Sequence, residues 1–254
     1  MINIHLVPCL KDNYAYLIHD RKTDAVAAVD PSEASPVIAA LATHGLSLTH
    51  ILNTHHHFDH TGGNLELKSR TGAKVIGPKA DCDRIPGIDI MVSEGDLVAI
   101  GTSIARVFDI PAHTRGHIAF WFESAKAVFT GDTMFAMGCG RLFEGTAAQM
   151  WDSLSKLAQL PGDTRVYCGH EYTQANGRFA LTLEPENADL MRRMEDVDLR
   201  RRQGLPTIPS TIDLELRTNP FLRPTSIPLR RTLCLQDADT VEVFAEIRRR
   251  KDAF

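Results

Sequence analysis

Residues 54–63 read THHHFDHTGG, so four histidines and one aspartate fall within six positions. The preceding apolar run His50–Asn53 predicts a strand, and the following segment Gly63–Thr71 has the composition of a helix. Side chains between a strand and a following helix lie at the carboxyl end of a sheet, where α/β proteins place their sites. Imidazole and carboxylate together are the ligands that Zn²⁺ and similar divalent metals take. The stretch therefore predicts a metal site, with more donors than one ion usually needs.

A site with two metals requires further histidines and aspartates at the ends of later strands, and three such places occur. DIPAHTRGH follows one apolar run and ends at position 117, FTGD ends another at 132, and YCGH ends a third at 170. The first motif contains His113 and His117, and the other two end in Asp132 and His170, so each place offers a candidate ligand. Spacing alone leaves open whether these side chains converge.

Composition and charge predict an ordinary globular protein without a bulk electrostatic partner. Of the 254 residues, 43% are hydrophobic and 24% charged, and the net charge is −4, which gives no general attraction for nucleic acid or an anionic membrane. The N-terminal sequence lacks the pattern of a secretory signal, and no apolar run approaches the ~18 residues of a membrane span. The scattered, unpaired cysteines favour a reducing compartment. We therefore expect a cytoplasmic protein that binds neither nucleic acid nor membrane.

The pattern of short apolar runs predicts a strand-rich first part. Turn signals separate runs of β type, which outnumber the helical segments and favour a mixed-sheet sandwich covered by helices. The predicted strands are Asn3–Val7, Tyr14–His19, Ala25–Asp30, His50–Asn53, Lys74–Ile76, Leu97–Ile100, Ser103–Asp109, Ile118–Phe122, Ala127–Phe129 and Arg165–Cys168. The predicted helices in this part are Glu33–Thr43, Gly63–Thr71 and Ala147–Gln159. Beyond about residue 171 the chain is rich in helix formers and arginine, which places a domain boundary near residues 170–175.

The order of the candidate ligands resembles that of the metallo-β-lactamase-fold hydrolases, over residues 1 to about 170. The resemblance rests on His55-x-His57-x-Asp59-His60 followed by His113, Asp132 and His170. It implies an α/β fold of the αββα sandwich type and two divalent metal ions. One ion would take His55, His57 and His113. The other would take Asp59, His60 and His170, with Asp132 bridging the two.

Four further segments resemble the glyoxalase II (hydroxyacylglutathione hydrolase) family and extend the likeness over nearly the whole chain. They are GCGRLFEGT at 138–146, CGHEYT at 168–173, TNPFLR at 218–223 and the terminal RRKDAF. The resemblance implies a catalytic domain at 1–172 and a smaller C-terminal α-helical domain at 173–254 that binds the glutathione part of the substrate. By the motif match, the substrate-binding residues would be Arg141, Tyr172, Arg248 and Lys251. Where some relatives have tyrosine, this chain has Phe143, so one hydroxyl contact is absent.

The implied reaction is hydrolysis of an S-2-hydroxyacylglutathione thioester, with S-D-lactoylglutathione as the first substrate to test. It would yield glutathione and D-lactate, as in the second step of the glyoxalase pathway that detoxifies methylglyoxal. Two metals can lower the pKa of a bridging water to about 7, so that hydroxide attacks the thioester carbonyl. Asp132 would bridge the metals, and Asp59 could orient the hydroxide or accept its proton. Zinc is the favoured metal, with iron or manganese as alternatives.

Other interpretations of the same residues remain open at this stage. A persulfide dioxygenase or a lactonase of the same fold could keep most of the histidine motif, although neither is expected to carry the terminal RRKDAF. A non-catalytic scaffold or metal-storage protein should have lost some ligands, whereas all seven are present. The run Arg248–Lys251 could equally be a solvated helix end. We expect His56 to point away from its neighbours, leave His117 open as a structural residue, and predict a monomer.

Overall fold

The computed structural model describes residues 2–254, which form two compact units. The first contains residues up to 109 together with 114–131, and the second contains residues 110–113 and 132–254. Residues 132–172 are grouped with the helical segment by this division. The predicted domain boundary after residue 172 therefore stays a prediction from sequence.

The first sheet of unit 1 is mixed, as the sequence predicts. Its six strands follow the order β1-β2-β3-β4-β5-β6. The β1–β2 and β2–β3 pairs are antiparallel, and β3 to β6 run parallel to one another. The strands are β1 Ile2–Cys9, β2 Asn13–Asp20, β3 Ala25–Val29, β4 His50–Leu52, β5 Lys74–Pro78 and β6 Ile90–Val92.

The second set of strands in unit 1 is an antiparallel meander. Successive strands pair in the order β7, β8, β9, β10, so neighbours in sequence are neighbours in the sheet. The strands are β7 Leu97–Ile100, β8 Ser103–Asp109, β9 Ile118–Phe122 and β10 Ala127–Gly131. Each of these strands was predicted within about two residues. The alternation of apolar residues in short runs was therefore a sufficient signal for them.

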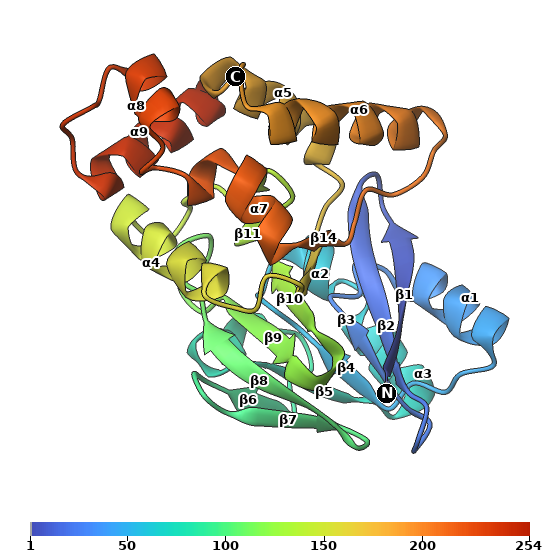
Figure 1. Ribbon diagram of the computed structural model, residues 1–254. Helices are drawn as coiled ribbons and strands as arrows, with labels where there is room; N and C mark the ends of the chain where they lie inside the picture. Colours follow the sequence, from blue (N-terminus) through green and yellow to red (C-terminus); the bar gives the residue numbers. More distant parts are fainter. Residues whose placement is uncertain (1) are drawn as a thin grey trace. The chain divides into compact units, whose positions relative to one another are not determined.

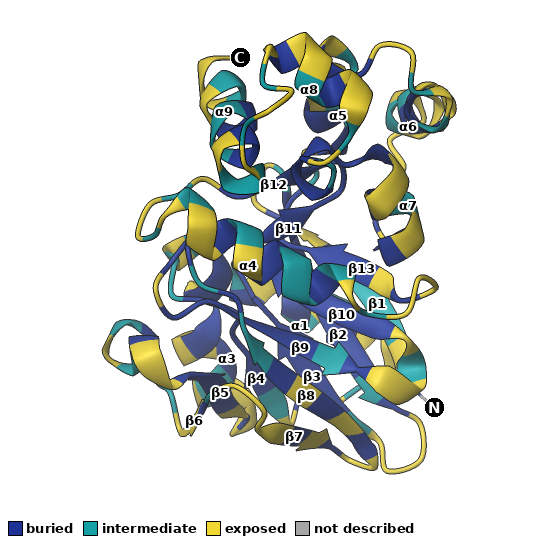
Figure 2. Ribbon diagram, turned by 60° about the vertical axis from the view of Figure 1, so that its left-hand side comes forward, coloured by how far each residue is buried: buried dark blue, intermediate teal, exposed yellow. Residues whose placement is uncertain are grey.

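The core of unit 1 has two layers, because the strand β2 is buried on both faces. Leu17 packs in a cluster with Val37 and Leu41 of helix α1 (Ala34–His44). Tyr16 points to the other face, where its ring lies 5.5 Å from that of Phe129 on β10. A strand covered on both faces carries a continuous apolar run, which explains the sequence of β2. Figure 2 shows the inner strands in dark blue as buried.

Three α-helices belong to the described part of unit 1, and two of them cover the outer face of the first sheet. Helix α1 lies beside β1 and β2 (Figure 1), and α3 (Asn64–Thr71) packs against α1 and β5. Helix α1 ends at Gly45, whose φ of 66° is left-handed and suits glycine. Between them lies the single turn α2 (Phe58–Thr61), inside the histidine-rich stretch. A helix of four residues makes about one turn, which is too short to show a helical repeat in the sequence.

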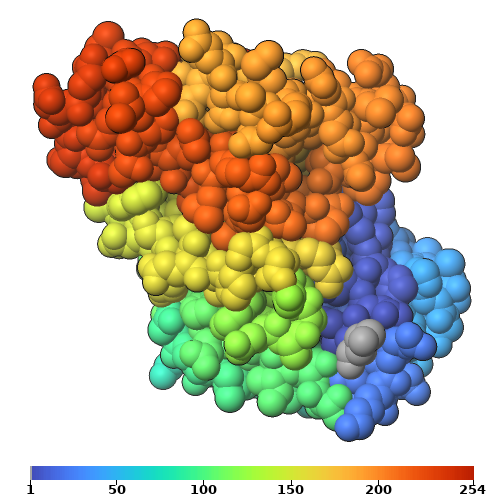
Figure 3. All heavy atoms as spheres, in the orientation of Figure 1, coloured from blue at the N-terminus to red at the C-terminus, as the bar shows by residue number. Residues whose placement is uncertain are grey.

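Unit 2 is mainly helical. Its strands are β11 Met134–Phe135, β12 Gly138–Cys139, β13 Arg165–Cys168 and β14 Ser210–Thr211. Its helices are α4 Ala147–Ala158, α5 Thr173–Leu183, α6 Ala188–Arg202, α7 Ile212–Thr218, α8 Ile227–Leu233 and α9 Thr240–Ala253. Helix α4 packs against α7 and α9, and α8 packs against α9. Figure 3 shows the atoms of the C-terminal part of this unit in orange and red.

Helix α4 begins and buries its face as the sequence predicts. The Thr146 hydroxyl accepts from the Gln149 N–H, and the Gln149 side chain accepts from the Thr146 N–H, forming a capping box. Met150, Leu154 and Leu157 lie three or four residues apart and are all buried.

Within residues 2–254, we find no helix with the length and apolar character needed to cross a membrane.

Candidate metal centre

The histidine-rich stretch occupies the turn between β4 and α2. His55 and His57 precede the helix, and Asp59 and His60 lie within it. The two glycines that follow are required by close packing. A Cβ atom on Gly63 would lie 2.8 Å from the Pro31 carbonyl oxygen, and one on Gly62 would lie 2.5 Å from that of Ser32. This close approach brings the stretch against the end of β3.

Two of these imidazoles are oriented by a buried carboxylate that the sequence analysis did not identify. The Thr54 hydroxyl donates a hydrogen bond to Asp30 at 2.7 Å. The Thr54 oxygen therefore acts as the acceptor for His55 Nδ1, at 3.0 Å. Asp30 also accepts from His60 Nδ1 at 3.1 Å. In a neutral imidazole whose Nδ1 carries the proton, Nε2 presents a lone pair. Both rings are thus held in the tautomer that binds a metal through Nε2.

His55 and His57 approach each other as two ligands of one ion do. The distance from His55 Nε2 to His57 Nδ1 is 3.1 Å, and the ring planes cross at 82°. Two nitrogens bound tetrahedrally to one Zn²⁺ at about 2.0–2.1 Å each lie roughly 3.3 Å apart. The observed separation fits a shared cation.

Unit 2 contributes a second arrangement of the same kind. Asp132 follows β10, and its Oδ2 lies 3.5 Å from His113 Nε2 and 3.3 Å from His170 Nε2. His113 Nδ1 donates to the Arg141 carbonyl at 2.9 Å, which leaves its Nε2 as an acceptor. One carboxylate therefore lies beside two imidazole nitrogens, which suits a ligand shared between two ions.

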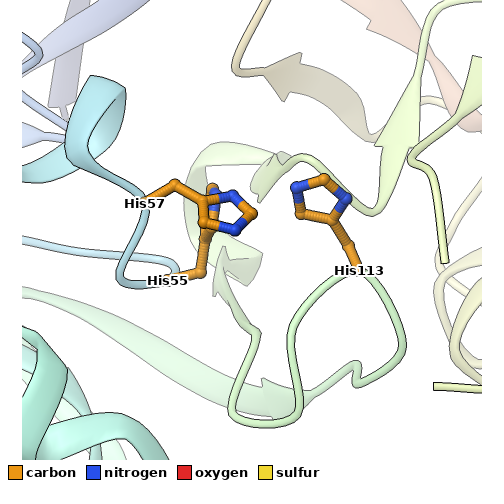
Figure 4. A group of neighbouring side chains, drawn as sticks. All are labelled: His55, His57 and His113. Carbon is orange, nitrogen blue, oxygen red and sulfur yellow. The ribbon is translucent and has the colours of Figure 1, made fainter. Parts of the chain in front are cut away.

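The potential ligand atoms gather into groups that follow the sets implied by the family resemblance. Within one group the ligand atoms lie within 4.8 Å of one another; the groups are His55, His57 and His113, then Asp59, His60 and His170, and then Asp30, His55 and His60. Figure 4 shows the rings of the first group turned toward one another. The third group differs in kind, because Asp30 accepts a hydrogen bond from His60 Nδ1 and reaches His55 only through the Thr54 hydroxyl, so it orients these rings rather than competing for an ion.

The predicted substrate-binding residue Tyr172 lies directly on a predicted ligand. Its ring stacks on that of His170 at 4.6 Å with an angle of 5° between the planes. Phe135 meets both rings edge-on, at 5.3 Å from Tyr172 and 6.0 Å from His170. These contacts fix the direction of the His170 ring within unit 2.

Arg248 is buried and already has protein partners. Its guanidinium donates to the Cys139 carbonyl at 2.9 Å, pairs with Asp252 at 2.7 Å and lies over the ring of Phe221 at 5.1 Å. The helix end that carries Arg248 is therefore not simply solvated. Its role in binding substrate stays a prediction.

The two other predicted cations lie near the same aspartate. Arg141 is exposed, with its Nε 3.9 Å from Asp252. Lys251 lies between the rings of Phe179 and Phe254, at 5.4 and 5.1 Å. Burial and, next to it, the charges of Arg248 and Arg141 lower the pKa of the Lys251 ammonium. The three cations thus form one positive cluster around a single carboxylate, which is suited to hold an anionic ligand.

Several residues whose role the sequence left open lie outside the ligand groups. His56 Nδ1 lies 3.2 Å from Asp81, and its ring is 6.5 Å from that of His55 but only 4.8 Å from that of His57, so it turns away from one neighbour and not from the other. His117 donates to the Ile118 carbonyl at 3.1 Å and stacks on His55 at 4.5 Å, which is a supporting role. Phe143 is exposed, with its ring 5.1 Å from that of His113.

The buried cysteines near the site are poor nucleophiles. Burial raises the pKa of the Cys139 thiol to about 11 and that of Cys168 to about 12. A thiol with so high a pKa carries almost no thiolate at neutral pH. Both cysteines act in packing, as the absence of an adjacent base in the sequence indicates.

Comparison with known proteins identifies the two parts of the chain separately. Residues 12–170 match the metallo-beta-lactamase superfamily, and residues 171–254 match the hydroxyacylglutathione hydrolase C-terminus. The hydroxyacylglutathione hydrolase of Methylococcus capsulatus is 56% identical over 254 residues, which is 100% of this chain and 99% of the relative. That of Rhodospirillum rubrum is 54% identical over 253 residues and covers 100% and 99%.

Solved structures give the same fold. ETHE1 from Myxococcus xanthus has a TM-score of 0.67 at 26% identity and covers 100% of this chain and 99% of its own. The BLEG-1 B3 metallo-beta-lactamase also has a TM-score of 0.67, at 22% identity, covering 87% of this chain and 100% of its own. TTHA1623 was solved in a di-iron-bound form, with a TM-score of 0.63 at 26% identity, covering 85% and 98%.

The mixed sheets, the helical C-terminal region and the superfamily match define a metallo-β-lactamase-fold protein, which confirms the predicted fold class. Within that class, the match of the C-terminal region and the identity of more than 50% over whole relatives narrow the assignment. The chain belongs to the hydroxyacylglutathione hydrolase family. The prediction that it is an enzyme of this family is confirmed.

Proposed function

We propose that this chain hydrolyses S-2-hydroxyacylglutathione thioesters, with S-D-lactoylglutathione as its first substrate. The products would be glutathione and a 2-hydroxy acid, here D-lactate, which is the second step of the glyoxalase pathway for methylglyoxal detoxification. The observation that supports this most is the pairing of two His/Asp ligand groups with a C-terminal region that matches hydroxyacylglutathione hydrolases. The activity of the curated relatives agrees with it.

Two divalent metal ions per chain are part of this proposal, and the donor set fits them. His55, His57 and His113 would hold one ion, Asp59, His60 and His170 the other, and Asp132 would contact both. We favour zinc, while iron and manganese also accept imidazole and carboxylate ligands. When bound, such ions activate water at neutral pH and polarise a carbonyl oxygen.

The residues of the chain would do the remaining work of positioning and proton transfer. The carboxylate of Asp59 lies 3.7 Å from His60 Nε2, where it could orient the attacking water and accept its proton. The leaving group is a thiolate, whose conjugate acid has a pKa of about 8.5, so it departs with little help. No separate acid residue is therefore required, and Asp59 and Asp132 are the catalytic carboxylates of the proposal.

The positive cluster of unit 2 would hold the anionic glutathione part of the substrate. Arg141 and Lys251 have side-chain surface to offer, and Arg248 is fixed beside them by the Cys139 carbonyl and Asp252. Tyr172, whose ring stacks on that of His170, would offer its hydroxyl to the substrate. Phe143 would contribute an apolar surface in place of the hydroxyl contact of some relatives.

The wider setting of the protein belongs to the proposal as well. We propose a cytoplasmic enzyme whose partner is a small-molecule glutathione thioester and which acts as a monomer. The five cysteines all lie among the described residues, and none of them forms a disulfide there, which suits a reducing compartment.

The direct test follows the loss of S-D-lactoylglutathione with purified protein, before and after treatment with a chelator. Metal-dependent release of glutathione supports the proposal. A protein that holds its metals but leaves the thioester intact would contradict it. A lactone and glutathione persulfide serve as parallel substrates, because turnover of either one in place of the thioester would favour a lactonase or a dioxygenase.

A further inference from the structure

Asn13 makes two hydrogen bonds to Asp59. Its amide Nδ2 donates to the Asp59 main-chain carbonyl at 3.0 Å and to the Asp59 carboxylate oxygen Oδ2, also at 3.0 Å. Asn13 is 5% exposed and lies 46 residues from Asp59 in sequence. The two hydrogens of one amide therefore meet the two kinds of acceptor that Asp59 offers.

The local backbone explains why the Asp59 carbonyl accepts this donor. In a longer helix, the Gly63 N–H would bond to the carbonyl four residues earlier, which is that of Asp59. Here the Gly63 N–H donates to the Pro31 carbonyl at 2.9 Å instead. The helix α2 ends at Thr61, and Asn13 supplies a donor to the Asp59 carbonyl from outside.

The second hydrogen bond reaches the carboxylate of Asp59, which is the group proposed to bind a metal ion. The Asp59 oxygen that Asn13 binds, Oδ2, is also the one that lies 3.7 Å from His60 Nε2. Asn13 thus fixes the backbone and the carboxylate of Asp59 at once, which determines the rotamer of this side chain. Asn13 is itself held in place, because it is the first residue of β2 and pairs with Cys9 across the β1–β2 hairpin. The two hydrogen bonds from Asn13 therefore hold Asp59 against a rigid element.

We propose that Asn13 is a positioning residue that holds Asp59 in the orientation in which it binds one metal ion and directs the reacting water. The inference rests on the proposed function and extends it to a residue outside the ligand set. Hydrogen-bonded partners of metal ligands typically contribute 10- to 100-fold to metal affinity. Asn13 should therefore act on the ion held by Asp59, His60 and His170 and leave the ion of the other group unchanged.

The test measures metal binding rather than turnover alone. Wild-type protein, Asn13→Ala and the isosteric Asn13→Asp are stripped of metal and titrated with Zn²⁺ against a chromophoric chelator. We expect the dissociation constant of one of two zinc ions to rise 10- to 100-fold in Asn13→Ala. Asn13→Asp should lose at least as much, because it sets a second carboxylate against that of Asp59.

Ser103→Ala is the matched control for stability. The Ser103 hydroxyl donates at 3.0 Å to the buried carboxylate of Asp20, in the same unit but among residues with no predicted metal ligand. It should lower the unfolding midpoint while both zinc ions bind with wild-type affinity. If Ser103→Ala lost zinc to the same degree as Asn13→Ala, the effect would follow from stability and the positioning role would be wrong.

The remaining outcomes separate this inference from the proposed function. Wild-type affinity for both ions in Asn13→Ala would overturn the role of Asn13 even if the wild-type protein hydrolyses the thioester. A wild-type protein that binds two ions without hydrolysing the thioester would contradict the function. In that case, selective loss of one ion in Asn13→Ala would still support the role of Asn13 in positioning Asp59. A wild-type protein that binds no zinc, iron or manganese would overturn both.

Discussion

The histidine-rich stretch at 54–63 and the basic end of the chain at 248–254 hold their predicted site residues in different ways. In the first, the donors are close in sequence, and the hydrogen bonds to Thr54 and Asp30 only choose which nitrogen faces an ion. In the second, Arg248 is fixed by the carbonyl of Cys139, 109 residues away. One short segment thus supplies four of the seven predicted metal ligands, whereas the position of the basic residue depends on a partner from a distant part of the sequence.

The largest expected effect follows from removing a ligand of the short segment. His57→Ala should lower kcat about 10³-fold or more, because it removes metal-derived stabilisation of several kcal/mol, and each 1.36 kcal/mol is tenfold. Metal analysis should show a parallel loss of bound ions. His19→Ala is the control, since His19 pairs with the exposed Asp24. Full activity in His57→Ala would remove this residue from the site.

The next effect concerns the framework of the helical region. Glu215 is fully buried, pairs with Arg193, and accepts from the Met137 N–H at 2.8 Å. Breaking a buried ion pair leaves one charge without compensation, so Glu215→Ala should lower the free energy of unfolding by about 3–5 kcal/mol. Urea unfolding measures this. In contrast, Glu246→Ala removes two surface pairs, with Arg249 and Arg250, and should cost roughly 0.2–1 kcal/mol for each pair.

Equal losses in these two variants would show that the helical region does not depend on its buried pair.

A smaller effect is expected in the strand-rich unit 1, where the free energy of unfolding should depend on pH through one buried carboxylate. Burial raises the pKa of the Asp20 carboxyl, but hydrogen bonds from the Lys22 N–H, Thr102 and Ser103 outweigh it and leave that pKa below its ordinary value. A pKa lowered by folding gives stability above the unfolded value of about 3.9, and this stability is lost as pH falls below it. Asp20→Asn should cost about 1.5–3 kcal/mol at pH 7.

The difference in unfolding free energy between wild type and Asp20→Asn should shrink as the pH is lowered from 5 to 3. Urea titrations at several pH values give this difference directly. A gap that stays constant across that range would mean that the Asp20 charge contributes nothing to stability. The exposed Asp24 offers a matched replacement, Asp24→Asn, for which we expect a change below ~1 kcal/mol at every pH.

The smallest expected effect addresses the basic end itself. Lys251→Ala should raise KM for the glutathione thioester by up to about fivefold with kcat unchanged, because a partly exposed ion pair contributes roughly 0.2–1 kcal/mol. Initial-rate kinetics separate the two constants. Arg249→Ala is the comparison, since Arg249 pairs with Glu246 on the exposed side of α9. If both variants gave the same KM, Lys251 would have no special part in binding substrate.

Much of the fold was predictable because its signals are local. The strands β8 and β9 and the helix α4 carry regular apolar spacing, and the structure places them within two residues of the prediction. The strands β11 and β12 were missed, because two residues are too few to show a period. Their hairpin depends instead on Asn219, whose amide donates to the carbonyls of Phe135 and Gly138.

The candidate site divides in the same way. Residue type and strand-end position indicated the candidate ligands, and the family resemblance implied which seven of them form the set. Asp30 also follows a strand, and that position was a usable signal, but Asp30 acts by accepting a hydrogen bond from His60 Nδ1. Asn13 gave no signal, because a single asparagine after a turn resembles many others and its partner lies 46 residues away. Partners that orient ligands across the fold become visible only in the structure.

The central claim is that the ligand groups hold two metal ions that the reaction requires. The most direct measurement titrates metal-free protein with zinc and records, at each addition, the ions bound per chain and the rate of S-D-lactoylglutathione hydrolysis. We predict that binding saturates at two ions per chain, with little activity before metal is added and full activity at saturation. Full hydrolysis by the metal-free chain, or saturation at two ions without any hydrolysis, would contradict the account.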